Sequence, residues 1–231
     1  MKLARNWLEL DEVASTQQVA ADFVRHNDES KSIVFAHDQI AGKGRFGRGW
    51  LSTKGESLTM SLIFWDYADW PKPWLVGIGV ALALAECLDC QVRWPNDLTF
   101  GDLKTGGILT EIYQDREQRR VPVVGVGLNL LQHEFPHELP HATSVRKATG
   151  RAVHPRDVAD HFLTTLDGFP EPREWSDIGS HWVARDTTPG KHYKLPDGQI
   201  ATAIEVTADG ALRCTSAGFE QIIFAADAIF G

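Results

Sequence analysis

The sequence predicts an α+β protein, in which a mixed sheet covered by helices is followed by a small all-β module, SH3-like in size. In residues 1–184, apolar runs of strand length alternate with longer apolar-periodic segments of helix length. From about Asp186, short apolar runs instead alternate with turn signals such as Pro189-Gly190 and Ala208-Asp209-Gly210, which indicates strands alone. We therefore predict two domains, at 1–184 and 185–231.

Four segments have the sequence pattern of helices. A Ser-Thr pair suits the start of a helix over residues 15–25, whose apolar side chains share one face. Residues 74–88 are almost all apolar and exceed the usual length of a strand, so they predict a buried helix. Residues 155–166 and 174–182 predict two further helices.

The other apolar runs of the first domain predict strands. Residues 32–36 have the composition of a buried strand, and a second strand is expected over 58–65. Residues 92–94 give a short strand that the following proline ends. Residues 107–113 and 121–130 are expected to pair as a hairpin across the polar segment between them.

Composition limits the kinds of partner. The formal net charge of −8 gives a field that repels nucleic acid and anionic membranes, so an anionic substrate needs a local cluster of cations. Three cysteines are too few for a disulfide framework, and neither a signal segment nor a membrane-spanning run is evident. We expect a cytoplasmic protein with no DNA and no membrane partner.

Residues 42–50, GKGRFGRGW, combine three cations with glycines at the spacing of a dinucleotide-binding turn. No apolar-periodic helix follows between Gly47 and Leu58, so a Rossmann site is rejected. Glycines let backbone amides approach an oxyanion, arginines bind phosphate or carboxylate at two points, and the Trp50 ring is able to stack on a purine. From the residues alone, two alternatives stay open: a solvated basic loop, or a loop that closes over a ligand.

Three later segments carry further polar groups. Residues 93–98, RWPNDL, place Asn96 and Asp97 on a turn that the proline fixes. Asn96 is able to hydrogen-bond a ligand, and Asp97 is able to hold Mg²⁺ or orient an amine. Lys104 stands ahead of a strand beside two glycines, which suits charge that builds on a carboxylate and an α-phosphate as they react. A strand that ends in GVGLN supplies Asn129. Singly, each segment has an ordinary alternative as a turn, a solvated lysine or a strand cap.

Together and in this order, the motifs resemble the biotin protein ligase family, the biotin–[acetyl-CoA-carboxylase] ligases. The resemblance runs from Ser-Thr-Gln at 15–17 through Gln39 and the segment 42–50 to WPNDL at 94–98, then to KTGGILTE at 104–111 and GVGLN at 125–129. It implies a mixed-sheet, biotin/lipoate ligase-like catalytic domain at 1–184 and an SH3-like C-terminal domain at 185–231.

The resemblance implies an ATP-dependent ligation of biotin, via biotinyl-5′-AMP, to a lysine of a biotin carboxyl carrier protein. ATP, biotin and Mg²⁺ would take part, the partner would be the carrier domain of acetyl-CoA carboxylase or a related carboxylase, and a homodimer is left open. Biotin would be held by a set that spans the first helix, the glycine segment and the lysine strand: Ser15, Thr16, Gln17, Gln39, Gly42, Lys43, Gly44, Arg45, Lys104 and Gly107.

The same resemblance implies the remaining roles. ATP would be bound by Arg45, Arg48, Trp50, Asn96 and Asn129. Lys104, Arg45 and Asp97 would be catalytic, and Asp97 would also be the magnesium ligand.

The sequence departs from the family pattern at Lys43 and Arg93, where the family usually has arginine and lysine respectively. The first change removes a guanidinium fork from the loop, which bears on how tightly it retains the adenylate. Because the motifs begin within the first residues, we expect a form without the N-terminal DNA-binding domain. Two alternative functions are kept: a lipoate or octanoate ligase of the same superfold, and a non-catalytic SH3-like adaptor.

Overall fold

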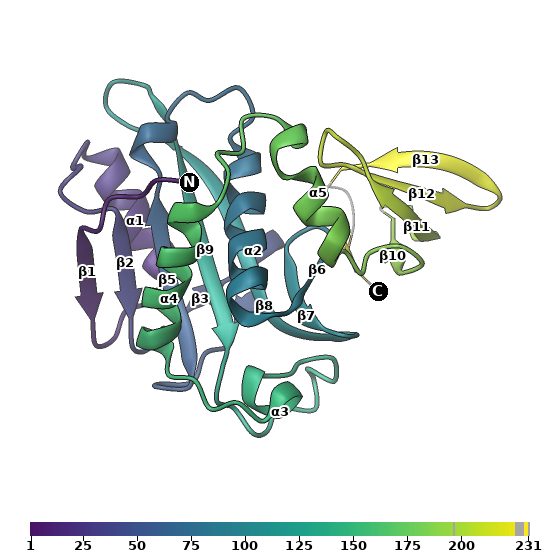
Figure 1. The fold of residues 1–231 in the computed structure, drawn as a ribbon, viewed down its shortest axis with the longest axis horizontal. Helices are drawn as coiled ribbons and strands as arrows, with labels where there is room; N and C mark the ends of the chain where they lie inside the picture. Colours follow the sequence, from purple (N-terminus) through teal and green to yellow (C-terminus); the bar gives the residue numbers. More distant parts are fainter. Residues whose placement is uncertain (196, 225–228, 231) are drawn as a thin grey trace.

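A seven-stranded mixed sheet is the centre of the computed structural model, which describes residues 1–195, 197–224 and 229–230 (Figure 1). The strand order is β1-β2-β5-β9-β8-β7-β6, and only the β1–β2 pair is parallel. The strands are β1 (Trp7–Leu10), β2 (Ile33–Ala36), β5 (Ser57–Ile63), β6 (Gln91–Arg93), β7 (Asp97–Phe100), β8 (Leu103–Gln114) and β9 (Arg120–Asn129).

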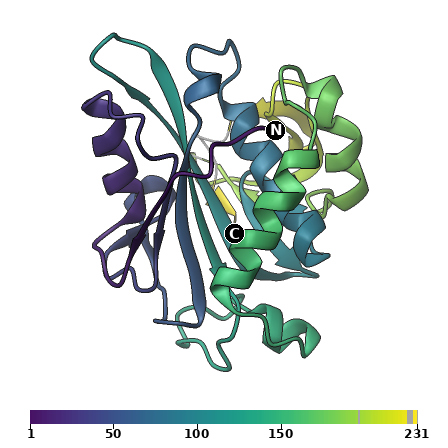
Figure 2. The ribbon, with the colours of Figure 1, turned by 60° about the vertical axis from the view of Figure 1, so that its left-hand side comes forward.

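Helices cover both faces of this sheet, as Figure 2 shows in edge view. One face is covered by α2 (Trp74–Leu88) and α4 (Pro155–Gly168), and α5 (Trp175–Arg185) packs beside α2. The other face is covered by α1 (Thr16–Arg25), whose Ala20 and Val24 belong to a second, smaller core cluster. Because α2 packs on the sheet with α4 on one side and α5 on the other, it is apolar around nearly its whole circumference. The short α3 (Val145–Thr149) follows the loop after β9.

The described C-terminal strands form a separate antiparallel sheet in the order β13-β12-β11-β10-β14. Its strands are β10 (His192–Lys194), β11 (Ile200–Val206), β12 (Leu212–Ser216), β13 (Phe219–Ile223) and β14 (Ile229–Phe230). This sheet and the α2 side of the large sheet share one continuous core cluster. The observed architecture confirms the predicted fold class, whereas the division at 184/185 stays a prediction.

Three hydrogen bonds join the C-terminal segment to Trp94. The backbone N–H of Trp94 donates to Thr188 Oγ1 at 2.8 Å, and its indole Nε1 donates to the carbonyl of Gly210 at 2.9 Å. The Tyr193 hydroxyl donates to the Trp94 carbonyl at 2.7 Å. Gly210 has a φ of +72° and lies so close to Trp74 that a Cβ there would be 2.6 Å from its ring. The β11–β12 turn is therefore held tightly against the main domain.

Most of the predicted elements are found where the sequence placed them. The helix over 74–88 and the hairpin of 107–113 with 121–130 are confirmed, and β8 and the C-terminal ends of α4 and α5 are longer than predicted. The strand expected over 58–65 ends at Ile63, since a 3-10 turn, η2 (Trp65–Tyr67), follows. In the part of the chain that the structure describes, no helix has both the length and the apolar character needed to cross a membrane.

Two placements were wrong. Asp97 is not on the turn but is the first residue of β7, and Lys104 is not ahead of a strand but within β8. Both errors have one cause: β7 and the beginning of β8 form a short hairpin, and Gly101 at its turn has a φ of +57°. Four further features were not predicted: β1, β7, α3 and the short strands of the glycine segment.

Candidate active site

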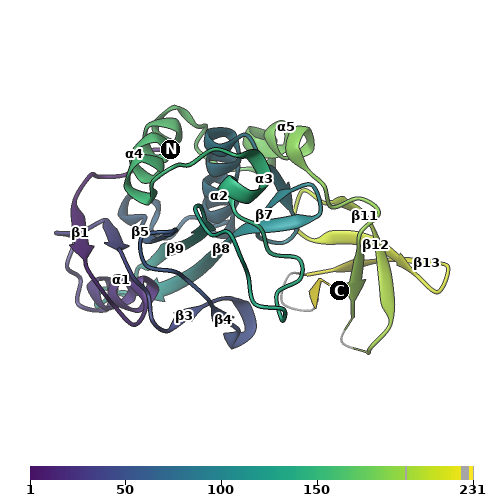
Figure 3. The same cartoon turned by 90° about the horizontal axis from the view of Figure 1, so that it is seen from below.

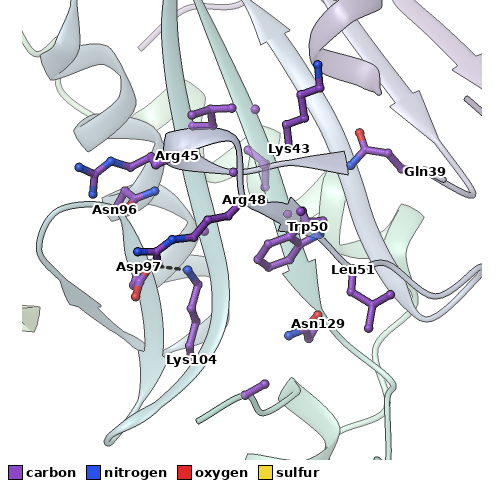
Figure 4. A pocket seen from close by; sticks show the side chains of 18 of the residues that line it. Gln39, Lys43, Arg45, Arg48, Trp50, Leu51, Asn96, Asp97, Lys104 and Asn129 are labelled. Atoms are coloured by element: carbon purple, nitrogen blue, oxygen red, sulfur yellow. Dashed lines mark ion pairs between the residues drawn. The ribbon is translucent and has the colours of Figure 1, made fainter. Parts of the chain in front are cut away.

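A cavity of about 420 Å³ opens on the α1 face of the large sheet, within the size range of small-molecule sites. Figure 3 shows the glycine segment on this face, opposite α2 and α4. We call it the central cavity; Figure 4 shows residues that line it. It brings together all but one of the predicted site residues: Ser15, Thr16, Gln17, Gln39, Lys43, Gly44, Arg45, Arg48, Trp50, Asn96, Asp97, Lys104, Gly107 and Asn129.

Gly42 is the predicted residue that does not line the cavity, but its lack of a side chain matters. A Cβ at this position would lie 2.4 Å from Gln39 Nε2 and 2.8 Å from the carbonyl oxygen of Trp50. Any larger residue would therefore displace the Gln39 side chain or the strand that carries Trp50. Gly42 supports the site without facing it.

One end of the central cavity is a network of neutral polar groups. Gln39 Oε1 accepts hydrogen bonds from the backbone N–H of Thr16 at 2.9 Å and from its hydroxyl at 3.1 Å. The Thr16 hydroxyl also contacts Ser61 Oγ at 2.9 Å, and Ser61 Oγ donates to Gln17 Oε1 at 2.9 Å. Gln17 Nε2 donates to the carbonyl of Val123 at 3.2 Å. These contacts fix the rotamers of four polar side chains before any ligand arrives.

The fold brings this network together from three elements. Thr16 and Gln17 are the first two residues of α1, Gln39 follows β2, and Ser61 lies in β5 opposite Gly125 of β9. A Cβ at Gly125 would be 2.8 Å from Gln17 Oε1, so the glycine gives the glutamine its space. Ser15 is buried as the N-cap residue, although its side chain makes no capping hydrogen bond.

The opposite part of the cavity is charged. Lys104 Nζ lies 2.6 Å from Asp97 Oδ1, and Arg93 donates to Asp97 Oδ2 at 3.1 Å. Arg93 is almost completely buried, whereas the Lys104 side chain is about one-third exposed toward the cavity. One carboxylate therefore faces two cations in a partly desolvated place, where electrostatic interactions are stronger than in bulk water.

A β-bulge sets the direction of Lys104. The β7–β8 register pairs Leu98 with Gly106 but Thr99 with Lys104, so Thr105 is an extra residue in β8. Bulges of this kind re-aim a side chain, and here Lys104 reaches the same face as Gly107. The backbone N–H of Lys104 donates to the carbonyl of His141 at 2.7 Å, which fixes the strand from its outer side.

The glycine segment is an ordered hairpin rather than a loose loop. It consists of β3 (Gly42–Lys43), a 3-10 turn η1 (Arg45–Gly47) and β4 (Gly49–Trp50). The N–H of Gly44 donates to the carbonyl of Arg48 at 2.7 Å across its base. Phe46 at its tip has a φ of +58°, an unusual conformation for an aromatic residue, and its ring is exposed.

In Figure 4, Arg48 extends from this hairpin toward the Lys104–Asp97 pair, whereas Arg45 extends toward Asn96. The Arg45 guanidinium lies 4.8 Å from the centre of the Phe46 ring. Burial lowers the pKa of Arg45, and the neighbouring Arg48 acts in the same direction, whereas the carboxylate of Asp97 opposes them. The guanidinium stays charged at neutral pH, so the hairpin adds cations beside the Lys104–Asp97 pair.

Trp50 lies over the glycines of the central strands. A Cβ at Gly127 would be 2.4 Å from Cε2 of the indole, and the Lys104 ammonium is 5.9 Å from the ring centre. Gly127 pairs with Gly107 across β8 and β9, so two adjacent glycines form the floor beneath the ring. Asn129 is the last residue of β9, and its Nδ2 donates to the carbonyl of Thr143 at 3.2 Å.

The donor set does not fit a magnesium ion held by protein side chains alone. Asp97 already faces the cations Arg93 and Lys104. Elsewhere among the described residues, His, Cys, Asp and Glu side chains do not gather into a group of three or more able to hold a metal. Hard divalent cations prefer several oxygen ligands, which a substrate's phosphates would have to supply.

Sequence reasoning missed several lining residues. Ser61 is the most important, since it links Thr16 to Gln17. Its signal was present, because Ser57, Thr59 and Ser61 alternate with apolar residues in a fully buried strand. The segment after β9 also lines the cavity with Phe135 and Leu139. That contribution had no sequence signal, because the segment has no regular structure.

The model of the biotin/lipoate A/B protein ligase family matches residues 10–129, just over half of the chain. The chain belongs to this family. The match contains the α1 network, the glycine hairpin, Asp97, Lys104 and Asn129, and thus most of the cavity. The family resemblance expected from the sequence is confirmed.

Individual relatives agree with the assignment. The bifunctional ligase/repressor BirA of Bacillus subtilis is 33% identical over 166 residues, which cover 68% of this chain and 51% of the relative. The chain thus spans about half the length of that relative. The biotin–[acetyl-CoA-carboxylase] ligase of Mycobacterium tuberculosis is 28% identical over 96% of this chain and 89% of its own length. The structure of the Aquifex aeolicus biotin protein ligase with biotin and ATP matches 98% of both chains at a TM-score of 0.75 and 25% identity.

Proposed function

We propose that this protein is a biotin–protein ligase, which activates biotin with ATP and transfers the biotinyl group to a lysine of a carrier domain. The observation that carries the proposal is the division of one cavity into a neutral hydrogen-bonding end and a cationic part. Biotin has the same two ends, a ureido ring and a carboxylate. Relatives named as biotin ligases and the Aquifex complex with biotin and ATP support this function.

The neutral end suits the ureido ring. Gln39 and Ser61 are connected through Thr16, so the donors and acceptors are already oriented when the ring enters. A site built around buried hydrogen bonds rejects ligands that leave those groups without partners. A lipoyl or octanoyl chain has no such polar ring, so the network favours biotin over these alternatives.

The cationic part suits the first reaction. A carboxylate oxygen of biotin attacks the α-phosphorus of ATP, a new O–P bond forms, and the bond to the β-phosphate breaks to release pyrophosphate. Lys104, Arg45 and Arg48 line the cavity around this point and would stabilise the negative charge of the transition state. Asp97 would hold the Lys104 ammonium in position through their 2.6 Å contact. Magnesium, where present, would arrive on the nucleotide phosphates and neutralise part of their charge.

The nucleotide would lie beyond the reacting centre, toward the end of β9. Trp50 offers an aromatic face there, and Asn129 offers a side-chain amide. Asn96 lies on the other side of Lys104, with Nδ2 fixed to the carbonyl of Ile108 at 2.7 Å. We assign Trp50 and Asn129 to the base and Asn96 to the region of the phosphates.

In the second step the acceptor lysine amine, in its neutral form, attacks the carbonyl carbon of biotinyl-5′-AMP. An N–C bond forms, the C–O bond to the phosphate breaks, and AMP leaves with the electron pair, while the amine loses its proton to water. The partner would be a biotin carboxyl carrier domain. A homodimer stays a prediction, and the repressor activity named for the Bacillus relative is no part of the proposal.

The decisive experiment measures each step separately. The protein is incubated with ATP, Mg²⁺ and either biotin or lipoate, and the exchange of labelled pyrophosphate into ATP is followed. A purified carrier domain is then added, and its mass is measured. We expect pyrophosphate exchange with biotin but not with lipoate, and a carrier domain whose mass increases by one biotinyl group. Exchange with lipoate but not biotin would favour the rival ligase, and no exchange with either would favour the adaptor.

A further inference from the structure

A second cavity of about 390 Å³ lies beside the first, and its purpose is not explained by the binding of biotin or ATP. We call it the side cleft. Trp74 and Ile78 of α2 and Trp94, at the turn between β6 and β7, give it an apolar and largely aromatic lining. Phe224 and Asp209 of the C-terminal segment form the opposite wall.

The side cleft adjoins the central cavity. Both are lined by Arg45, Pro95, Asn96 and Leu109, so these residues separate the two spaces. The cleft runs along β8 beyond Gly107, where the strand is no longer paired with β7. A group inside the cleft is therefore one residue layer away from the Lys104–Asp97 pair.

The direction of approach singles out this cleft. In Figure 4, Gln39 and Asn129 lie on one side of the Lys104–Asp97 pair, and Arg45 and Asn96 lie on the other. Under the proposed function, the ureido ring points toward Gln39 and the base toward Asn129. These two directions are then filled by the mixed anhydride itself. The Arg45–Asn96 side becomes free once pyrophosphate has left the region of Asn96, and the side cleft, which Arg45 and Asn96 also line, then gives the acceptor amine a path to the carbonyl carbon.

The walls of the cleft suit a lysine and its neighbour. Aromatic faces attract ammonium groups and also cover methylene chains, and both Trp74 and Trp94 offer such faces. Asp209 is exposed at the rim and adds a negative charge that favours a cation. Since a cavity of about 150 Å³ already holds a benzene-sized group, a cleft of this volume has room for more than one side chain.

The C-terminal sheet positions the outer wall. The Trp94 indole donates to the Gly210 carbonyl, and Gly210 lies against Trp74, so the turn that carries Asp209 is fixed over the cleft. Phe224 is 57% exposed, an unusual position for a large apolar side chain at the edge of an aromatic cavity. Exposed apolar groups beside a hollow often mark contacts with another protein.

We propose that the side cleft binds the surface turn of the acceptor protein that presents the target lysine, with one apolar side chain beside that lysine resting on the Trp74–Trp94 lining. The inference rests on the proposed function and extends it by naming the docking surface of the protein substrate. On this view the C-terminal sheet contributes to acceptor recognition and leaves adenylation to the central cavity.

Three variants test the proposal: Phe224→Ala and Asp209→Asn alter the outer wall, and Ile78→Phe fills the cleft. Phe219→Ala is the matched control. Phe219 is an exposed phenylalanine at the start of β13, whereas Phe224 directly follows that strand, and Phe219 does not line the cleft. Each protein is measured by biotin-dependent pyrophosphate exchange, by biotinyl transfer to hydroxylamine, and by transfer to a carrier domain at varied carrier concentration.

We expect Phe224→Ala and Ile78→Phe to raise the KM for the carrier roughly 5- to 30-fold, the usual effect of losing a central apolar contact. Asp209→Asn should raise the KM for the carrier by less, and the difference from the parent protein should disappear at high salt. Exchange and transfer to hydroxylamine should stay within about twofold of the parent protein, because a small nucleophile needs no docking surface.

The outcomes separate this inference from the proposed function. Normal exchange together with an unchanged carrier KM in all three variants would overturn the docking surface and leave the ligase activity standing. A loss of exchange as large as the loss of carrier transfer would instead assign the cleft to adenylation and also overturn it. Absence of biotin-dependent exchange in the parent protein would overturn the proposed function, and this inference with it.

Discussion

Replacement of Gly127 by alanine tests whether the Trp50 ring and the floor beneath it belong to the nucleotide site. The new methyl group would lie 2.4 Å from Cε2 and 2.8 Å from Nε1 of the indole, whereas ordinary contacts begin near 3.4 Å. The indole therefore has to retreat by about 1 Å, and the glycine hairpin that carries it has to move as well.

The cost of this movement can be bounded. Overpacking costs about 1–3 kcal/mol in a rigid core, and movement of a surface hairpin relieves part of this cost. We therefore expect the free energy of unfolding to fall by about 1 kcal/mol. Stacking of a base on an aromatic side chain is worth about 1–3 kcal/mol. Partial loss of that stacking should raise the KM for ATP roughly 5- to 30-fold. Binding of biotin alone should be affected less than binding of ATP, since the hydrogen bonds between Gln39 and Thr16 do not involve the Trp50 ring.

The assay is pyrophosphate exchange at varied ATP, with biotin binding measured by calorimetry without nucleotide. Gly107→Ala is the matched comparison: it adds the same methyl group on the adjoining strand, but its nearest ring atom of Trp50 is 3.7 Å away. Gly168→Ala, at the end of α4, has no atom within 4 Å and serves as the neutral control. Equal effects of Gly127→Ala and Gly107→Ala, or an unchanged KM for ATP, would refute the reasoning.

Three further predictions follow from the site and its surroundings. Lys104→Ala should lower the exchange rate about 100- to 1000-fold because a preorganised charge is lost; an exchange rate near that of the parent protein would contradict the assigned role. Thr16→Val keeps the shape but removes the hydroxyl bonded to Gln39 and Ser61, so the KM for biotin should rise roughly 5- to 30-fold while the KM for ATP stays the same, as exchange kinetics would show. Burial raises the pKa of the Cys87 thiol to about 11 and that of Cys90 to about 12. At pH 8 both are thus almost wholly protonated, and mass spectrometry should find them alkylated by iodoacetamide far more slowly in the native protein than in urea; equal rates would show that the pKa values are not raised.

The elements that the sequence predicted well are those whose pattern is local. Residues 74–88 form a helix because a run of fifteen almost entirely apolar residues fits no other buried element of that length. The β8–β9 hairpin follows from two strand-like runs joined by a short polar segment. In contrast, β1 has only four residues, and its partner is a parallel strand on the far side of α1 in the sequence. Nothing within Trp7–Leu10 reveals that pairing.

The same distinction applies to the site. The motifs predicted which residues gather around the cavity, because each motif is a short run whose residue types and spacing can be recognised in the sequence alone. Two features depend on packing and strand register. Ser61 meets Gln17 because α1 packs over β5 and β9, and Lys104 faces the cavity because Thr105 bulges out of the β7–β8 register. A register shift carries no sequence signal of its own, so these features required the structure.

The junction at Trp94 has a consequence for protein engineering. Its amide, carbonyl and indole groups are each satisfied by a residue of the C-terminal segment: Thr188, Tyr193 and Gly210 respectively. Trp94 in turn directly precedes the turn that leads to Asp97. A shortened version cut after α5 would leave these three polar groups without hydrogen-bond partners and would loosen the backbone that positions Asp97. A chimera that carries a different C-terminal sheet therefore has to supply hydrogen-bonding groups for the amide, carbonyl and indole of Trp94.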